Sequence, residues 1–318
     1  MGIRAVPLAF DSMGVRSQAT LVETPDLRAV IDPGVALGPA RYGLPPHPLE
    51  LRREEELRAR VFEEARRSDL LVVSHYHHDH FDPFEPGLAE GKVLYLKHPT
   101  EATNRSQRGR AAEFLKGLGK GPKKIEFADG RSFRHGGTSL TFSPPVFHGT
   151  DDRLGYVVEV CVEHGGERMV FASDVEGPPM PDQFDFMLRS RPDLLLVDGP
   201  MTSMLGHRYS REALDASIAH LCRLVKETEV ETLIADHHFL RDAGYAGHLD
   251  AVREVSRERG ARVLTAAEFA GRPVEPLEAR RRELYRREPA EKRPYTRFSR
   301  RGSGTLSPRS AAAESRGG

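Results

Sequence analysis

One short segment of the chain concentrates side chains that bind metal ions: His75, His77, Asp79 and His80 lie within six positions. The segment follows an apolar run, residues 70–73, that we expect to form a buried strand. In an extended chain, residues two positions apart point the same way, so His75 and His77 can present their imidazoles to one metal ion. A turn at Asp79 and His80 can offer a carboxylate and an imidazole to a second ion. The spacing therefore predicts parts of two neighbouring metal sites.

Two metal ions need more ligands than this segment supplies, and further ligand-type side chains also follow apolar runs. Each of them alone has an ordinary explanation, as a loop histidine, a turn aspartate or a polar surface pair. Their common position after apolar runs shifts the balance towards one shared site. These residues are Asp32, His148, Asp174 and the adjacent pair His237 and His238.

Other polar residues are candidates for a supporting role. His78 is expected to point away from His75 and His77, either behind the ligands or into solvent. Several residues that follow predicted strands or precede a predicted helix could line the mouth of the site, with caps, salt bridges or solvent exposure as the alternatives. These are Lys97, His98, Asp198 and residues 207–209.

Short apolar runs alternate with amphipathic stretches along most of the chain, which is typical of mixed α/β layers. Four helices are expected, each apolar on one side only, so they must cover a sheet. The predicted strands are residues 18–23, 29–31, 70–74, 93–96, 139–142, 156–162, 169–172, 194–197, 232–235 and 263–264. The predicted helices are residues 49–67, 100–118, 211–227 and 249–259.

The composition changes near residue 288, which divides the chain into a domain over 1–287 and a tail over 288–318. The tail has seven Lys or Arg against three Glu and almost no aliphatic residues, so we expect it to be basic and disordered. Because Tyr295 and Phe298 are interleaved with its cations, a weak RNA- or phosphate-binding arm is the alternative.

The overall composition argues against several partners. Lys plus Arg equals Asp plus Glu, so the net charge gives no reason to expect nucleic acid or a membrane as the default partner. All apolar runs are strand-sized, so no membrane span is predicted. Cys161 and Cys222 are expected to be reduced thiols, and a cytoplasmic location follows from that expectation. The sequence leaves the oligomeric state open.

The ordered set of candidate ligands resembles the five sequence motifs of the metallo-β-lactamase superfamily, over nearly all of residues 1–275. The second motif, His75-x-His77-x-Asp79-His80, is the most specific of the five. Three further stretches, residues 31–39, 173–177 and 235–238, look like a branch of uncharacterised predicted hydrolases in that superfamily. The resemblance implies an α/β (α+β) fold, a four-layer αββα sandwich.

The resemblance also implies a role for each candidate ligand. Asp174 would bridge two metal ions, and Asp32 would orient the ligands by hydrogen bonding. A one-residue shift at the end of the strand would exchange His237 with His238, so both remain open for the last position. The ligands implied for the first metal are His75, His77 and His148, and those for the second are Asp79, His80 and His237.

The donor set favours zinc. No Cys occupies a ligand position, and His77 stands where the diiron relatives are expected to carry Glu. Imidazole-rich donors suit two Zn²⁺ ions, with iron or manganese as alternatives. Paired metals would supply a bridging hydroxide at neutral pH, so no protein nucleophile is required. Asp79 is the candidate proton shuttle, because it would be both a ligand and adjacent to the hydroxide.

These features predict a metal-dependent hydrolase acting on a small ester-like or lactone-like molecule. The first alternative is a phosphodiesterase or ribonuclease of the same fold, for which paired metals suit in-line attack on phosphorus. RNA would then be held by the basic tail. A non-catalytic metal-binding protein and a redox protein are the remaining alternatives.

Overall fold

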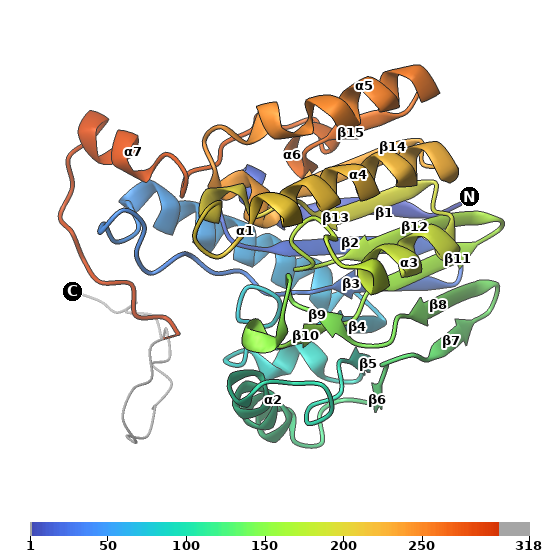
Figure 1. Ribbon diagram of the computed structural model, residues 1–318. Coiled ribbons are helices and arrows are strands. Elements are labelled where there is room, and N and C mark those ends of the chain that lie inside the picture. Colours follow the sequence, from blue (N-terminus) through green and yellow to red (C-terminus); the bar gives the residue numbers. More distant parts are fainter. Residues whose placement is uncertain (1, 299–318) are drawn as a thin grey trace, which may run out of the picture.

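The computed structural model describes residues 2–298. Two mixed β-sheets lie face to face, and helices cover their outer faces (Figure 1). The predicted four-layer αββα sandwich is therefore confirmed.

The first sheet has six strands in the order in which they occur along the chain. Strands β1 to β3 pair antiparallel, and β3 to β6 pair parallel. The strands are β1 (Arg4–Phe10), β2 (Gln18–Thr24), β3 (Leu27–Ile31), β4 (Leu70–Val73), β5 (Val93–Leu96) and β6 (Lys124–Phe127).

The second sheet has seven strands in the order β15-β14-β13-β12-β11-β8-β7, and β12 to β15 pair parallel. A separate two-stranded sheet pairs β9 (Val146–Phe147) with β10 (Tyr156–Val157). The seven strands are β7 (Ser132–His135), β8 (Thr138–Phe142), β11 (Val160–His164), β12 (Glu167–Ala172), β13 (Leu194–Asp198), β14 (Thr232–Asp236) and β15 (Arg262–Leu264).

Helices α1, α2 and α6 contribute buried residues to the core cluster of the first sheet, and α3, α4 and α5 contribute to a second cluster on the outer face of the second sheet. The α-helices are α1 (Pro48–Arg66), α2 (Arg105–Leu118), α3 (Pro181–Ser190), α4 (Arg211–Glu227), α5 (Asp250–Arg259), α6 (Ala266–Phe269) and α7 (Arg281–Arg287). The 3₁₀ turns are η1 (Asp11–Met13), η2 (Pro86–Ala89), η3 (Asp152–Leu154), η4 (Thr202–Met204), η5 (His237–Arg241) and η6 (Tyr245–Leu249).

Strand β12 shows how the two cores share one sheet. Its Val170 and Ala172 belong to the cluster under α3, α4 and α5, whereas Met169 and Phe171 belong to the cluster that includes the first sheet. Successive side chains point to opposite faces of a strand, so a strand buried on both faces needs an unbroken apolar sequence. Asp174 follows the end of this strand.

The predicted elements agree with the structure where the apolar pattern is strong and differ where it is weak. Residues 156–162, predicted as one strand, form β10 and β11 with a break between them. The helix predicted from residue 100 begins at Arg105, because the Asn104 side chain accepts a hydrogen bond from Gln107 N and caps it. The sequence analysis missed β1, β6, β7, β9, α3, α6 and α7.

Part of the predicted tail packs against the domain instead of extending into solvent. Residues 288–298 continue beyond α7, and the Tyr295 hydroxyl donates a 2.6 Å hydrogen bond to Glu54 Oε1. The Phe298 ring stacks on His78, with 4.5 Å between ring centroids. Residues 299–318, the remainder of the predicted tail, lie outside the described residues.

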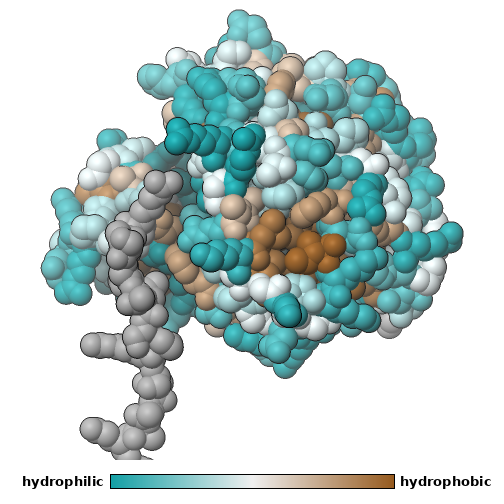
Figure 2. Space-filling view, turned by 90° about the horizontal axis from the view of Figure 1, so that it is seen from below, coloured by the Kyte–Doolittle hydropathy of each residue, from teal (hydrophilic) through white to brown (hydrophobic). Residues whose placement is uncertain are grey.

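Viewed from below, the surface is mostly hydrophilic, with one compact hydrophobic area near the middle of this face (Figure 2). Among residues 2–298, no helix combines the length and apolar character needed to cross a bilayer. Cys161 and Cys222 are both free thiols, as expected from the sequence.

Candidate metal centre

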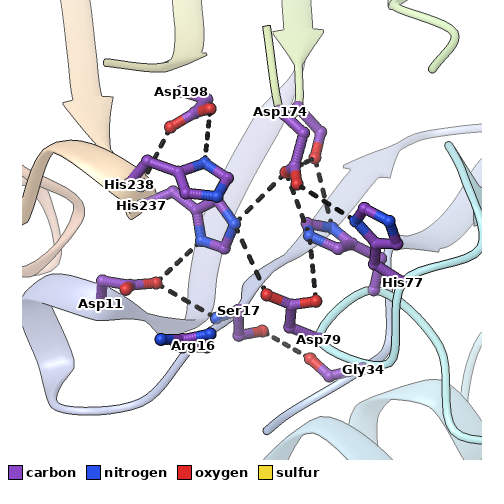
Figure 3. A network of polar contacts seen from close by, with 12 residues as sticks. Asp11, Arg16, Ser17, Gly34, His77, Asp79, Asp174, Asp198, His237 and His238 are labelled. Atoms are coloured by element: carbon purple, nitrogen blue, oxygen red, sulfur yellow. Dashed lines mark hydrogen bonds and ion pairs between the residues drawn. The ribbon is translucent and has the colours of Figure 1, made fainter. Parts of the chain in front are cut away.

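The candidate ligands come together from loops that follow strands of both sheets. The loop after β4 carries His75, and the loops after β9, β12 and β14 carry His148, Asp174 and His237. In Figure 3, Asp174 lies between His237 and His238 on one side and His77 on the other. The residues that the sequence singled out thus meet at one place, although they are spread over more than 160 positions of the chain.

Four of them form a first cluster. Single ligand atoms of His75, His77, His148 and Asp174 all lie within 4.8 Å of one another. Asp174 Oδ2 is 3.3 Å from His75 Nε2, 3.9 Å from His77 Nδ1 and 2.8 Å from His148 Nε2. Three imidazoles therefore converge on one oxygen of one carboxylate.

A second cluster, Asp79, His80 and His237, meets the same 4.8 Å limit. The other oxygen of Asp174 faces it, because Oδ1 is 3.0 Å from His80 Nε2 and 3.3 Å from His237 Nε2. Asp79 is 3.8 Å from His80 and 3.7 Å from His237. Asp174 thus presents one oxygen to each cluster, which is one arrangement in which a carboxylate can bridge two ions.

The unpaired atoms of the site fit a metal. His75 and His80 are fully buried, and the Nε2 atom of each lies near the Asp174 carboxylate without forming a hydrogen bond of good geometry in the described part of the chain. A buried polar atom without a partner is costly unless something else binds it, and imidazole nitrogen is a preferred zinc ligand. The assignment of these residues as ligands stays a prediction, but the donor set suits two divalent ions.

The electrostatics of the first cluster favour the form of histidine that binds metals. Burial and the nearby His80 lower the pKa of His75 well below its usual value, and burial lowers the pKa of His77 to about 4. Both imidazoles are therefore neutral at pH 7. A neutral imidazole has a free lone pair on one ring nitrogen, which is what coordination needs.

The ionised carboxylates of the site are stabilised by positive charge next to them. Burial opposes ionisation of Asp174, but the nearby imidazoles, above all the positively charged His80, outweigh it and hold the pKa of Asp174 well below its usual value. Burial lowers the pKa of His237, but the negative charges of Asp11 and Asp174 outweigh this effect and raise the pKa to about 10. The pKa of His80 is likewise raised well above its usual value, so both His80 and His237 carry a proton when no metal is bound. Metal ions bound at these residues would replace the protons and supply the positive charge instead.

Asp32 has the supporting position that the family resemblance implied. Its Oδ2 accepts hydrogen bonds from the Ser74 hydroxyl at 2.6 Å and from His80 Nδ1 at 2.9 Å, while Oδ1 accepts from Ser74 N at 2.7 Å. Holding Nδ1 of His80 fixes the ring so that Nε2 faces the second cluster. Asp32 also adopts a φ of 52°, in the left-handed region, and so turns the chain sharply after β3.

Gly34 allows this turn to approach the loop that carries His80. A Cβ at this position would lie 2.5 Å from His80 N and 2.2 Å from Phe81 N, both of which are backbone atoms. No side chain fits there unless one of the two loops moves. Its carbonyl also accepts a 2.6 Å hydrogen bond from the Ser17 hydroxyl. Gly34 therefore helps to set the position of His80.

The structure also reveals a supporting aspartate that the sequence analysis missed. Asp11 Oδ2 is 2.8 Å from His237 Nδ1, and Asp11 Oδ1 accepts a 2.8 Å hydrogen bond from Arg241 Nε. Arg241 in turn lies 3.5 Å from Asp79. Asp11 follows the end of β1, so it shares the strand-end signal of the ligands. The signal was overlooked because β1 was not predicted.

His238 has a different set of contacts from its neighbour. Its Nδ1 is 2.8 Å from Asp198 Oδ2, and its ring lines the cavity in front of the site. His237 instead faces Asp79 and Asp174, although ligand atoms of His238 and Asp174 also lie within 4.8 Å. The orientation of the rings favours His237 as the ligand at this position. Figure 3 shows both rings beside their aspartates.

A cavity of about 610 Å³ opens onto the clusters, a size suited to a small molecule. Arg208 lines it, as the sequence suggested. Asp198 does not line the cavity itself, but its contact with Nδ1 positions the ring of His238, which does. Lys97 does not line it, because its ammonium group is buried against Asp129, at 2.6 Å. The cavity is bounded by His77, Asp79, Asp174 and His238 from the centre, by five arginines, by Leu37, Leu154, Met201 and Met204, and by Tyr295 and Phe298.

The α/β sandwich and its buried cluster of His and Asp side chains define the class of protein to which the chain belongs. A family model described as a beta-lactamase superfamily domain matches residues 28–238, so the chain belongs to the metallo-β-lactamase superfamily. A UPF0282 protein of Korarchaeum cryptofilum is 52% identical over 285 residues, covering 89% of this chain and 94% of the relative. A UPF0282 protein of Sulfolobus acidocaldarius is 43% identical, covering 89% of this chain and 92% of the relative. The resemblance noted in the sequence is thereby confirmed.

Two solved structures are similar to this chain at low sequence identity. One is a metal-dependent hydrolase of the beta-lactamase superfamily, Tm1679, with 13% identity, a TM-score of 0.47 and coverage of 84% of this chain and 97% of that chain. Another is an isothiocyanate hydrolase from Delia radicum gut bacteria, with 15% identity, a TM-score of 0.47 and coverage of 80% and 94%.

Proposed function

We propose that this protein is a metal-dependent hydrolase of small molecules, with zinc as the metal. The observation that carries the proposal is the position of Asp174, whose two oxygens face two separate groups of buried ligand-type side chains. Two divalent ions held there would lower the pKa of a water molecule enough to supply hydroxide near neutral pH. His75, His77 and His148 would hold one ion and Asp79, His80 and His237 the other, with Asp174 shared.

Asp79 is the residue proposed to move a proton. It is the most exposed carboxylate of the two clusters and lines the cavity, so it can reach a bound molecule. His80, His237 and Arg241 approach it from the protein side, and together they keep the pKa of Asp79 well below its usual value although burial opposes this. Asp79 therefore stays ionised, as a metal ligand must be, and its position at the cavity makes it the candidate acceptor for a proton from an attacking water.

The proposed substrate is an ester-like or lactone-like small molecule. The cavity combines apolar side chains with a few polar groups next to the ligands, and such pockets bind small organic molecules. A phosphodiester is the second candidate, and the observation that favours it is the number of arginines in the cavity wall.

A substrate panel on the zinc-loaded protein tests the proposal. Carboxylic esters, lactones, thioesters, phosphodiesters and β-lactams should be compared, with metal content measured by elemental analysis. Hydrolysis of at least one class should stop on chelation and return with zinc. Metal bound at both positions without hydrolysis would favour a non-catalytic metal-binding protein, and iron in place of zinc would favour a redox role.

Asp174→Asn is the decisive variant, because it removes the charge that both clusters share. We expect loss of one or both metals and of hydrolysis. Asp215→Asn, on the exposed face of α4, is the matched control and should leave both unchanged. Full metal content and full activity in Asp174→Asn would contradict the proposed centre.

A further inference from the structure

The wall of the cavity is unusually cationic. Five arginines line it, whereas its acidic lining residues are Asp79 and Asp174. Two of the arginines have partners, because Arg16 forms a bidentate pair with Glu278 at 2.6 Å and Arg241 pairs with Asp11. The other three, Arg41, Arg110 and Arg208, form no ion pair with a carboxylate anywhere in residues 2–298.

Arg41 is held in place by contacts that leave its charge uncompensated. One terminal nitrogen donates a 2.7 Å hydrogen bond to the Arg241 carbonyl, and the guanidinium lies 5.0 Å from the centre of the Tyr42 ring. Its Nε is buried without a hydrogen-bond partner in the described part of the chain. The side chain is therefore positioned at the cavity but only partly satisfied.

Arg110 extends from α2 to the metal-binding loop, where its Nε donates to the Tyr76 carbonyl. Burial lowers the pKa of its guanidinium, which means that the surroundings disfavour the charge. The guanidinium nevertheless stays ionised at pH 7, since arginine titrates far above that pH. An anion bound in the cavity would stabilise the buried positive charge of Arg110 and so offset the free-energy cost of its burial.

Arg208 comes from a third segment of the chain, the loop between η4 and α4, and its side chain is exposed. It influences the pKa values of Asp151 and Glu176 without forming an ion pair with either. Three guanidinium groups from three separate segments thus converge on one cavity. Two divalent ions next to them would increase the positive charge further, which is unfavourable unless the bound molecule is negative.

We propose that Arg41, Arg110 and Arg208 bind an oxyanion of the substrate, either a phosphoryl group or a carboxylate. This proposal rests on the proposed function, because it assigns the substrate class of the same cavity. Guanidinium groups bind both oxyanions through paired, charge-assisted hydrogen bonds. The apolar part of the substrate would lie against Tyr295 and Phe298.

Three probes that share a phenyl ring test the proposal by calorimetry on the zinc-loaded protein: phenylphosphonate, benzoate and benzyl alcohol. Wild-type protein should bind at least one anion more tightly than the neutral alcohol. Preference for phenylphosphonate would identify a phosphoryl substrate, and preference for benzoate a carboxylate. Equal binding of the alcohol and both anions would overturn the proposal.

The variants Arg41→Gln, Arg110→Gln and Arg208→Gln separate the arginines from the metals, which also attract anions. Each should weaken binding of the preferred anion by roughly ten-fold or more, as expected for one lost charge-assisted hydrogen bond. Arg259→Gln, at the exposed end of α5, is the control and should bind as wild type does. Anion binding that is equal in all four variants and wild type would also overturn the proposal.

Thermal unfolding of each variant shows whether it is folded. Because binding is measured without turnover, the two proposals can fail separately. A protein that binds the anion through these arginines but hydrolyses no substrate would contradict only the hydrolase proposal. A protein that hydrolyses neutral esters with all three arginine variants unaffected would contradict only the anion site.

Discussion

Replacing Asp11 by Asn should weaken metal binding at the second cluster while leaving the first intact. Asp11 contacts two side chains of the site, since its Oδ2 is 2.8 Å from His237 Nδ1 and its Oδ1 accepts a 2.8 Å hydrogen bond from Arg241 Nε. Asn has a single acceptor oxygen, so one of these bonds must be lost. If His237 loses its bond, its ring is no longer fixed towards Asp79 and Asp174.

The expected loss is about ten-fold in the affinity of the second cluster. Residues that orient a metal ligand contribute roughly ten- to a hundred-fold to affinity, or about 1.4 to 2.7 kcal/mol. A second effect opposes this loss. Asp11 and Asp174 raise the pKa of His237 to about 10 against the effect of burial, and Asn at position 11 would reduce the competition from that proton. The net change should therefore fall at the low end of the range.

Competition for zinc with a chromophoric chelator, fitted to two sites, measures the change. Asp198→Asn is the matched control, because Asp198 makes the same type of contact, 2.8 Å long, with Nδ1 of His238. If His237 is the ligand, only Asp11→Asn weakens the second site. A larger loss in Asp198→Asn would refute the reasoning and identify His238 as the ligand.

Three further predictions concern the surroundings of the centre. Gly34→Ala should reduce zinc content and thermal stability together, because the added Cβ would contact the backbone of His80 and Phe81; unchanged zinc content would show that the loops can separate freely. Ending the chain after Glu288 removes Tyr295 and Phe298 from the cavity wall and should raise KM several-fold with little change in kcat; an unchanged KM would exclude a substrate contact there. Although burial opposes it, Arg16 lowers the pKa of Glu278 from 4.5 to about 2, so the pair stabilises the fold above about pH 4.5 and this contribution is lost as the pH falls through 2. Glu278→Gln should therefore lower the free energy of unfolding at pH 7 by about 2–3 kcal/mol in urea titrations, and a difference from wild type that persists below pH 2 would contradict this origin.

The strand-end pattern made the candidate site predictable from sequence. A strand buried on both faces, such as β4 or residues 233–235 of β14, is continuously apolar, so its end is easily recognised and the polar residues that follow it are placed at an edge of the sheet. His75 and His237 were found in this way. Strands such as β6 and β7 are short and partly exposed, and their mixed composition hides them. The segment before α3 contains Pro178 and Pro179, which favour a loop.

The sequence by itself therefore determined the class of fold and the set of side chains available for metal binding, because both depend on local patterns of apolar and polar residues. Only the tertiary structure decided which atoms face each other. The pairing of Asp11 with His237 joins residues 226 positions apart, and the approach of Phe298 to His78 brings the predicted tail to the cavity. Contacts of this kind depend on how two sheets pack, and no local pattern encodes that geometry.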